Sequence, residues 1–238
     1  MAADNLLQEP KGRAETGKRQ GPNGRYALVS PLGERLRAER DRLGLSLREL
    51  ARRLEVSPSL VSQIETGKIQ PSVRTLYAMV SELGVSLDDL FAADEPAASA
   101  PGLGPSRQHD PQSSAEPPLP EQGRVQRAAG RRVIELEAGV HWERLTTWND
   151  RDVDFLYAVY EVGGASSPEG KLVRHNGREF GIVVSGELGV TVGFEEHVLG
   201  PGDSISFESS IPHRLHNDGD EAVTAIWVVL GRYHDDRQ

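Results

Sequence analysis

The sequence contains no cysteine, which excludes disulfide bridges, thiol redox sensing and cysteine-ligated zinc. It also contains no apolar run near the roughly 18 residues that a membrane span needs. Its longest such run, AIWVVL, is typical of a buried strand. The first residues, MAADNLLQEPKGRAETGKRQG, lack the basic and apolar regions of a secretory signal. We therefore expect a protein that stays in the cytoplasm and has no membrane partner.

Positive charge is scarce in the second half of the chain. Residues 1–92 carry 14 Lys and Arg against 12 Asp and Glu, whereas residues 93–238 carry 13 against 24. A strongly acidic segment is a poor nonspecific binder of nucleic acid. If DNA is the partner, the N-terminal part must bind it, and the acidic part must face away.

Composition divides the chain into four segments. Residues 1–30 are polar and glycine-rich, which predicts a disordered tail. Residues 31–92 have the apolar spacing of helices, and residues 93–123 are rich in Pro, Ala and Ser, as in a flexible linker. Residues 124–238 contain the short, β-branched runs of strands. The sequence therefore predicts two domains, an all-α one followed by an all-β one.

Five short helices are predicted in the helical segment, and together they would form one compact bundle. The stretch LGERLRAERDRLG places Leu32, Leu36 and Leu43 near one face of the first helix. The second opens with a capping box, in which Ser46 can bond the backbone at Glu49 and Glu49 can reach back. The remaining helices are expected at residues 57–67, 72–84 and 86–91. The inner stripe of the fourth helix is expected to be Val73, Leu76, Met79, Val80 and Leu83.

The pair of helices in SLRELARRLEVSPSLVSQIETG has the spacing of a helix-turn-helix, whose second helix lies in the major groove of DNA. Its outward face must carry side chains that reach base edges, and Ser59, Ser62 and Gln63 are available there. An amide pair from Gln63 to adenine contributes about 1–3 kcal/mol of discrimination. Arg48 and Lys68 are candidate phosphate contacts.

The stretch LRELARRLEVSPSLVSQIETGKIQPSVRTLYAMVSELGVSLDDLF resembles the lambda-repressor-like (Cro/C1, or XRE) DNA-binding domain. The resemblance covers about 60 residues. It implies that the recognition helix falls on Ser57–Thr66 and that double-stranded operator DNA is a partner. The candidate DNA-binding residues are Arg48, Ser57, Ser59, Ser62, Gln63 and Lys68.

The second domain contains the short apolar runs VDFLYAVYEV, EFGIVVSGELGVTVG and AVTAIWVVL, separated by Gly, Pro and Asp turns. Strands at that spacing predict an antiparallel barrel or jelly roll. Within this domain, VRHNGREF places His175 and Glu179 on either side of the turn Asn176-Gly177, which would fold them together on paired strands. His213, in PHRLHN, could complete a set of three.

These residues resemble the two motifs of the cupin family. The first motif is carried by His175, Glu179 and Gly186, and the second by Gly200-Pro201-Gly202-Asp203, Pro212-His213 and Asn217. The family often has a further histidine ligand where this chain has Val173. The order of helix-turn-helix, linker and cupin looks like a class of bacterial regulators in which the double-stranded β-helix senses a small molecule.

Three interpretations of the cupin site follow from the residues. In the first, His175, Glu179 and His213 hydrogen-bond a small-molecule effector without a metal. In the second, they hold a divalent metal weakly, and the effector or water fills the remaining positions. In the third, they form a catalytic facial set, because two histidines and one carboxylate suit Fe(II) and also Mn, Ni or Zn.

The sequence thus predicts a DNA-binding transcriptional regulator whose cupin domain binds an effector, with no catalytic residue assigned. We expect a homodimer, because one small helix-turn-helix contacts too little DNA for tight binding and two half-sites solve that. The alternative is a mononuclear non-haem iron cupin enzyme, oxygenase- or epoxidase-like, that carries a helix-turn-helix domain.

Overall fold

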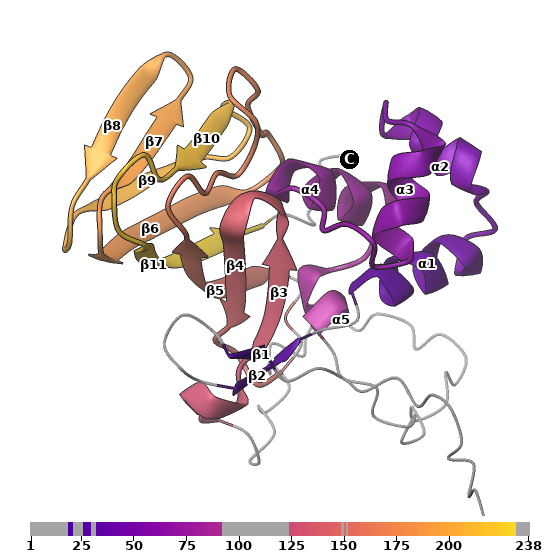
Figure 1. The fold of residues 1–238 in the computed structure, drawn as a ribbon, viewed down its shortest axis with the longest axis horizontal. Helices are drawn as coiled ribbons and strands as arrows, with labels where there is room; N and C mark the ends of the chain where they lie inside the picture. Colours follow the sequence, from indigo (N-terminus) through magenta and orange to yellow (C-terminus); the bar gives the residue numbers. More distant parts are fainter. Residues whose placement is uncertain are drawn as a thin grey trace, which may run out of the picture.

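The structure is a computed structural model that describes residues 19–20, 26–29, 32–91, 124–148, 150 and 152–231. The N-terminal helices and the C-terminal strands lie side by side (Figure 1). The helices of the described residues are α1 (Leu32–Arg42), α2 (Leu47–Arg53), α3 (Pro58–Glu65), α4 (Val73–Leu83) and α5 (Leu87–Phe91). In the described part of the chain, no helix is long and apolar enough to cross a membrane.

Serine side chains start four of these helices, and the one at α5 is Ser86, which accepts from the N–H of Asp89. Ser46, Ser57 and Ser72 each accept a hydrogen bond from the backbone N–H three residues later, at the starts of α2, α3 and α4. Gly84 ends α4 with a φ of 64°, a left-handed conformation that glycine adopts without strain. The predicted capping serine of α2 is therefore confirmed. The carboxylate of Glu49 pairs with Arg52 and Arg53.

The strands form two sheets. Eight strands follow the order β1-β2-β3-β4-β5-β11-β6-β9, and three follow the order β10-β7-β8. The pairs are antiparallel except β2 with β3, which is parallel. The strands are β1 (Arg19–Gln20), β2 (Tyr26–Val29), β3 (Arg132–Leu136), β4 (Val140–Arg144), β5 (Val153–Tyr160), β6 (Arg178–Ser185), β7 (Leu188–Val192), β8 (Glu195–Leu199), β9 (Ser204–Glu208), β10 (His213–His216) and β11 (Val223–Leu230). This all-β part confirms the predicted cupin barrel.

Two predicted segments lie mostly outside the described residues. The whole of the predicted linker, residues 93–123, is among them. Within residues 1–30, for which the sequence predicts a disordered tail, the structure describes β1 and β2. Leu28 of β2 pairs with Arg132 of β3, so part of the N-terminal segment extends the barrel sheet.

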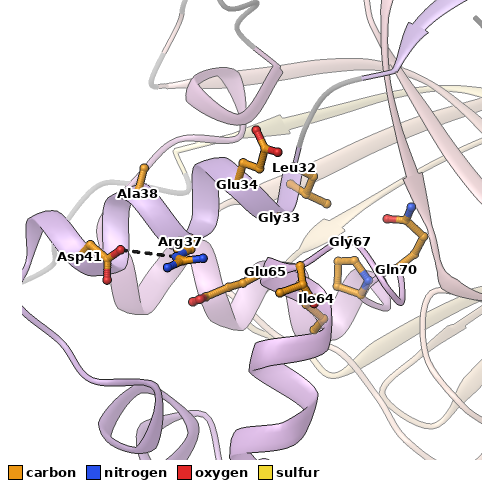
Figure 2. Close-up of a pocket in the computed structure, with 12 residues that line it drawn as sticks. Leu32, Gly33, Glu34, Arg37, Ala38, Asp41, Ile64, Glu65, Gly67 and Gln70 are labelled. Atoms are coloured by element: carbon orange, nitrogen blue, oxygen red, sulfur yellow. Dashed lines mark ion pairs between the residues drawn. The ribbon is translucent and has the colours of Figure 1, made fainter. Parts of the chain in front are cut away.

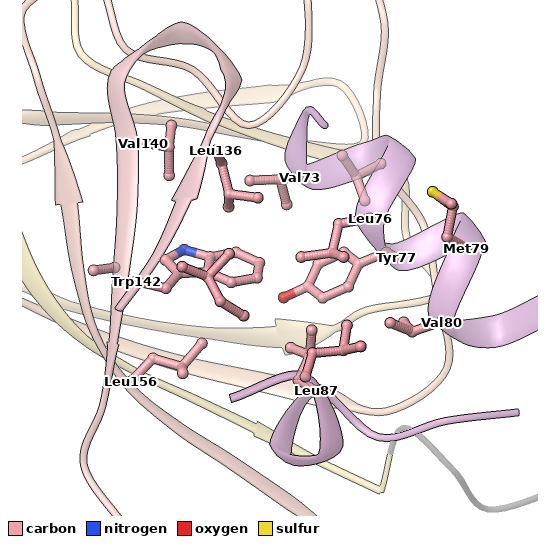
Figure 3. Close-up of a cluster of buried hydrophobic side chains, with 14 of the residues drawn as sticks. Val73, Leu76, Tyr77, Met79, Val80, Leu87, Leu136, Val140, Trp142 and Leu156 are labelled. Atoms are coloured by element: carbon pink, nitrogen blue, oxygen red, sulfur yellow. The ribbon is translucent and has the colours of Figure 1, made fainter. Parts of the chain in front are cut away.

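One apolar core runs through both parts of the molecule. Buried side chains of α4 and α5 belong to the same cluster as those of β3, β4 and β5. Figure 3 shows Tyr77 of α4 facing Trp142 of β4, with Leu76 and Leu87 on the helical side and Leu156 on the barrel side. The helical part and the barrel are therefore packed directly against each other.

One predicted core position is wrong. Leu43 is 42% exposed, because α1 ends at Arg42 and the chain turns away before Leu43 can reach the inner face. Leu32 and Leu36 are buried as predicted.

Candidate functional site

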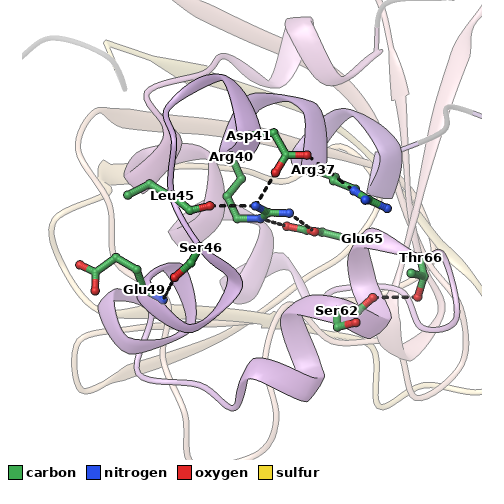
Figure 4. A network of polar contacts seen from close by, with 9 residues as sticks. All are labelled: Arg37, Arg40, Asp41, Leu45, Ser46, Glu49, Ser62, Glu65 and Thr66. Atoms are coloured by element: carbon green, nitrogen blue, oxygen red, sulfur yellow. Dashed lines mark hydrogen bonds and ion pairs between the residues drawn. The ribbon is translucent and has the colours of Figure 1, made fainter.

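The predicted recognition helix is α3, and its position is set by a buried ion pair with α1. Nε of Arg40 lies 2.6 Å from Oε1 of Glu65, and Nη2 lies 2.8 Å from Oε2. Arg40 also donates to Asp41 and to the carbonyl of Leu45 (Figure 4). A two-pronged arginine–carboxylate pair fixes orientation as well as distance. The end of α3 is thereby tied to α1 and to the turn that leads into α2.

The polar residues of α3 remain accessible. Ser57 and Ser59 are exposed, and Ser62 and Gln63 are half-buried. Nε2 of Gln63 donates to Oγ of Ser59 at 3.0 Å, so the amide already lies along the outer face of the helix. Its carboxamide oxygen is an acceptor that an adenine amino group can use.

The two predicted phosphate contacts, Arg48 and Lys68, are both exposed. Arg52 and Arg53 of α2, the helix that also carries Arg48, are held by the carboxylate of Glu49. Hydrogen bonds from these two arginines lower the pKa of Glu49 to about 2. Their charges are thus partly neutralised within the protein.

An open groove of about 570 Å³ lies between the start of α1 and the end of α3 (Figure 2). Gly33 allows this close approach, because a Cβ there would lie 2.2 Å from the carbonyl oxygen of Ile64. Arg37 and Asp41, which line the groove, are both exposed and 3.7 Å apart. Because no barrel residue lines it, this groove is separate from the histidine–glutamate cluster.

Inside the barrel, the structure brings the three predicted ligands together. Nε2 of His175 lies 3.0 Å from Oε1 of Glu179, and Nε2 of His213 lies 3.1 Å from the same oxygen. The three candidate ligand atoms all lie within 4.8 Å of one another, in a set that could hold a metal ion. Their side chains are almost completely buried.

Backbone carbonyls orient both imidazoles. Nδ1 of His175 lies 2.8 Å from the oxygen of Asn176, and Nδ1 of His213 lies 2.9 Å from that of Ile211. With the proton on each Nδ1, both neutral rings direct an Nε2 lone pair at one carboxylate oxygen. Such converging lone pairs repel one another unless a cation lies between them or the rings are protonated. This donor set therefore fits a divalent metal.

The second carboxylate oxygen of Glu179 is held by the core. Nε1 of Trp227 donates to Oε2 at 2.7 Å, across the pair of strands β6 and β11. Gly181 makes room for this indole, because a Cβ there would lie only 1.9 Å from its ring. Burial alone would raise the pKa of Glu179, but with both rings protonated instead of metal-bound, hydrogen bonds and positive charge from His175 and His213 hold it below its ordinary range.

The route by which His175 and Glu179 meet differs from the predicted hairpin. Glu179 lies on β6, which pairs with β9 and β11, whereas His175 lies in the loop before β6. The backbone N–H of His175 donates to the carbonyl of Ser209, and the backbone of Val173 forms an antiparallel β-bridge with that of His213. The loop is therefore held by the β9–β10 region, so the prediction of paired strands across the Asn-Gly turn was wrong.

Sequence reasoning missed Tyr77. Its ring centroid lies 4.6 Å from that of His175 and 5.4 Å from that of Trp142, and its side chain is buried. The available signal was the breadth of the apolar surface of α4, since Tyr77 extends the predicted inner stripe beside Val73 and Val80. A helix that is apolar beyond one face packs on more than one neighbour.

Comparisons with known proteins agree with this description. A helix-turn-helix family model matches residues 36–90, and a cupin domain model matches residues 156–229. The "HTH-type transcriptional regulator PuuR" of Escherichia coli K12 is 25% identical over 186 residues, which cover 78% of this chain and 86% of that protein. The "HTH-type transcriptional regulator DdrOP3" of Deinococcus deserti is 35% identical over 75 residues, 29% of this chain and 58% of that one.

A solved structure shows a similar fold. The "HTH_3 family Transcriptional Regulator from Vibrio cholerae" has a TM-score of 0.55 and 19% identity, and the match covers 85% of this chain and 96% of that one. The two parts thus define a helix-turn-helix protein with a cupin barrel. The chain belongs to the XRE-type helix-turn-helix transcriptional regulators that carry a C-terminal cupin domain.

Proposed function

We propose that the protein regulates transcription in the cytoplasm by reading operator DNA with α3, and that the His175–Glu179–His213 cluster is its sensory site. The observation that carries the proposal is the contrast between two sets of polar residues. Those of α3 face outward on a helix that is locked to α1 by Arg40 and Glu65. Those of the barrel converge on one buried oxygen.

Base reading is assigned mainly to Gln63, with Ser59 and Ser62 beside it. The hydrogen bond from Gln63 to Ser59 keeps the amide extended along the helix surface, so less side-chain freedom is lost when a base is contacted. Arg48, Lys68 and the N–H groups capped by Ser57 would contact phosphates.

Binding to the DNA upstream of the protein's own gene tests this assignment. Gln63→Ala should weaken sequence-specific binding by about 1–3 kcal/mol and relax the preference at one base pair. Ser81→Ala, an exposed change on α4, is the matched control and should bind like the unaltered protein. Equal affinity of Gln63→Ala and Ser81→Ala for the operator would refute the assignment.

In the sensory site, His175, Glu179 and His213 would hold a divalent metal such as Fe, Mn, Ni or Zn. When bound, the metal supplies a Lewis-acid position at which an oxygen-bearing effector can coordinate. Val173 is buried beside His213 and offers no ligand atom, so the protein contributes three ligands from this cluster. Metal content after purification without chelator, compared with that of His213→Ala, tests the site.

A second copy of the chain is proposed to cover the outer face of the large sheet. This face exposes Phe155, Phe180, Ile182 and Val184, and a groove of about 330 Å³ crosses β6, β9 and β11. A DNA reader with one recognition helix needs a partner for a second half-site, and an apolar face suits a permanent one. Ile182→Lys should convert a dimer to a monomer in sedimentation, whereas Val198→Lys on β8 should not.

An enzymatic role is the alternative, and one observation favours it. The cluster contains two histidines and one carboxylate, the ligand set of non-haem iron oxygenases. Oxygen consumption by the iron-loaded protein with a small organic acid, lost in His175→Ala, would support an enzyme. Operator binding that depends on Gln63 and persists in His175→Ala would support the regulator.

A further inference from the structure

The cavity at the sensory site is built by both parts of the molecule. Its walls include Trp142, Glu179 and His213 from the barrel, and Val73 and Tyr77 from α4. The open volume inside is about 20 Å³, enough for one water molecule or one ion. Pockets for organic ligands are typically about 300–1,000 Å³, so the cavity is closed to such ligands in this arrangement.

Tyr77 is the side chain of α4 that closes the cavity. Its ring packs against His175 at 4.6 Å and against Trp142 at 5.4 Å, so it bridges a candidate ligand and the opposite wall. Figure 3 shows Tyr77 on the side of α4 that faces the barrel and Met79 on the opposite side. The helix-turn-helix part thus supplies the lid of a site whose ligands all belong to the barrel.

Polar contacts hold the lid in place at both of its ends. Just before α4, the carbonyl of Pro71 accepts from the N–H of Glu137, and in the first turn of α4 the N–H of Arg74 donates to the carbonyl of Ser166. After α4, Asp88 of α5 forms a buried ion pair with Arg144 of β4. These contacts join the lid to the barrel at separate points, so α4 leaves the barrel only if they break or bend together.

We propose that Tyr77 gates the sensory site: a bare metal ion fits beneath it, whereas any larger ligand enters only when α4 lifts from the barrel. This inference rests on the proposed function, which makes the cluster a binding site. It adds that an organic effector cannot occupy the cavity while α4 of the DNA-binding part is packed on the barrel. The effector is thereby sensed as a change in the placement of α4, the helix next to the reader α3.

Access to His213 tests the gate without metal or effector. Chelator-treated protein is exposed to diethyl pyrocarbonate, a reagent larger than the cavity that modifies neutral imidazoles, and modification is followed by mass spectrometry. Fully packed regions open rarely, so His213 should react about 100-fold more slowly than the exposed His197. Modification of His213 as fast as that of His197 would overturn the gate.

Variants separate the gate from general loosening. Tyr77→Ala and the milder Tyr77→Leu should each accelerate modification of His213 by about tenfold or more, because the lid loses its ring. Tyr77→Phe should react like the unaltered protein, and so should Met79→Ala, a truncation of the same helix away from the cavity. Equal rates in Tyr77→Ala and Met79→Ala would overturn the assignment to Tyr77.

Lifting of α4 is measured by the distance between two spin labels, which the absence of native cysteine makes simple. The labels are placed at Ser81→Cys on α4 and Phe194→Cys on the exposed β7–β8 turn. Modification of His213 should lengthen this distance, and an unchanged distance would overturn displacement of the helix. Zinc binding by the unmodified protein is measured separately, so a failed metal site and a failed gate are distinguished.

Discussion

Arg40 of α1 and Glu65 of α3 are bound to each other through two parallel contacts, 2.6 and 2.8 Å long, with both side chains buried. The hydrogen bonds from Arg40 to Asp41 and to the carbonyl of Leu45 use the Nη1 group of the guanidinium. The hydrogen bond and charge of Glu65 raise the pKa of Arg40 despite its burial. The predicted recognition helix α3 is thus oriented by a buried charge pair.

Glu65→Gln is expected to lower the free energy of unfolding by about 3 kcal/mol, because the buried Arg40 guanidinium keeps only the exposed carboxylate of Asp41 as a counter-charge. Denaturant unfolding measures the loss, and operator binding should fall with it because α3 is no longer held. The double variant Arg40→Met/Glu65→Leu should recover most of the stability, since no buried charge is left. A loss below about 1 kcal/mol in Glu65→Gln would mean that water reaches the pair.

Asp88 gives the contact between α5 and the barrel a pH dependence. Burial raises the pKa of this carboxyl from 3.8 to about 6, although the N–H of Asp150 and the charge of Arg144 oppose the shift and Asp154 adds to it. The carboxyl has its ordinary pKa of 3.8 in the unfolded chain. Between pH 3.8 and about pH 6, Asp88 of the folded protein therefore holds a proton that the unfolded chain has lost. Its contribution to the free energy of unfolding therefore increases as the pH falls through 6.

The comparison of the unaltered protein with Asp88→Asn isolates this contribution, because the other groups titrate alike in both. The difference in their free energies of unfolding should rise by about 2 kcal/mol in favour of the unaltered protein between pH 7 and pH 4. Asp220→Asn, an exposed change on the barrel, is the control and should show no such trend. A difference that stays flat or falls on acidification would contradict the shift.

Trp227→Phe should weaken metal binding by about 10- to 100-fold, the usual cost of removing a group that holds a ligand in place. The variant keeps the aromatic packing but removes the N–H that donates to Oε2 of Glu179. Zinc affinity measured against a competing chelator gives the result. Trp148→Phe, on a half-buried indole outside the cavity, is the control. Unchanged affinity in Trp227→Phe would show that this indole does not position Glu179 for metal binding.

Lys68→Ala should weaken DNA binding to a similar extent on all sequences and reduce the slope of log affinity against log salt by about 1. Lys68 is exposed just after α3, where a charge can reach the phosphate backbone. Lys171→Ala removes an exposed lysine from the barrel and should leave both the affinity and the slope unchanged. If the two lysine variants behave alike, Lys68 does not contact the duplex.

The helical part could be predicted closely because its signals are local. Ser46, Ser57 and Ser72 begin their helices through contacts within three residues, and Gly84 ends one through its own backbone angle. The three residues of the barrel that could hold a metal could also be named from the sequence. Their convergence required the pairing of β6 with β9 and β11, which no local pattern contains.

The contact between α4 and the barrel could not be predicted in the same way. Tyr77 lies about 100 positions before His175, and the intervening residues include the linker, so nothing in the spacing links them. The ring of Tyr77 could equally well pack in the interior of a helical bundle that stands alone. Only the three-dimensional arrangement distinguishes a tyrosine that fills its own bundle from one that covers another domain's cavity.

The continuous interior has a consequence for how such proteins can be recombined. A cut between the helices and the barrel would expose Tyr77 and Leu87 to water on one fragment. On the other fragment it would leave the cavity beside His213 open to solvent. A chimera that receives its DNA-binding helices from another protein must therefore keep α4 and α5 together with the barrel, or carry helices that replace them. Because α1 also contacts α4 and α5, the new first three helices must match the surface of these two helices as well.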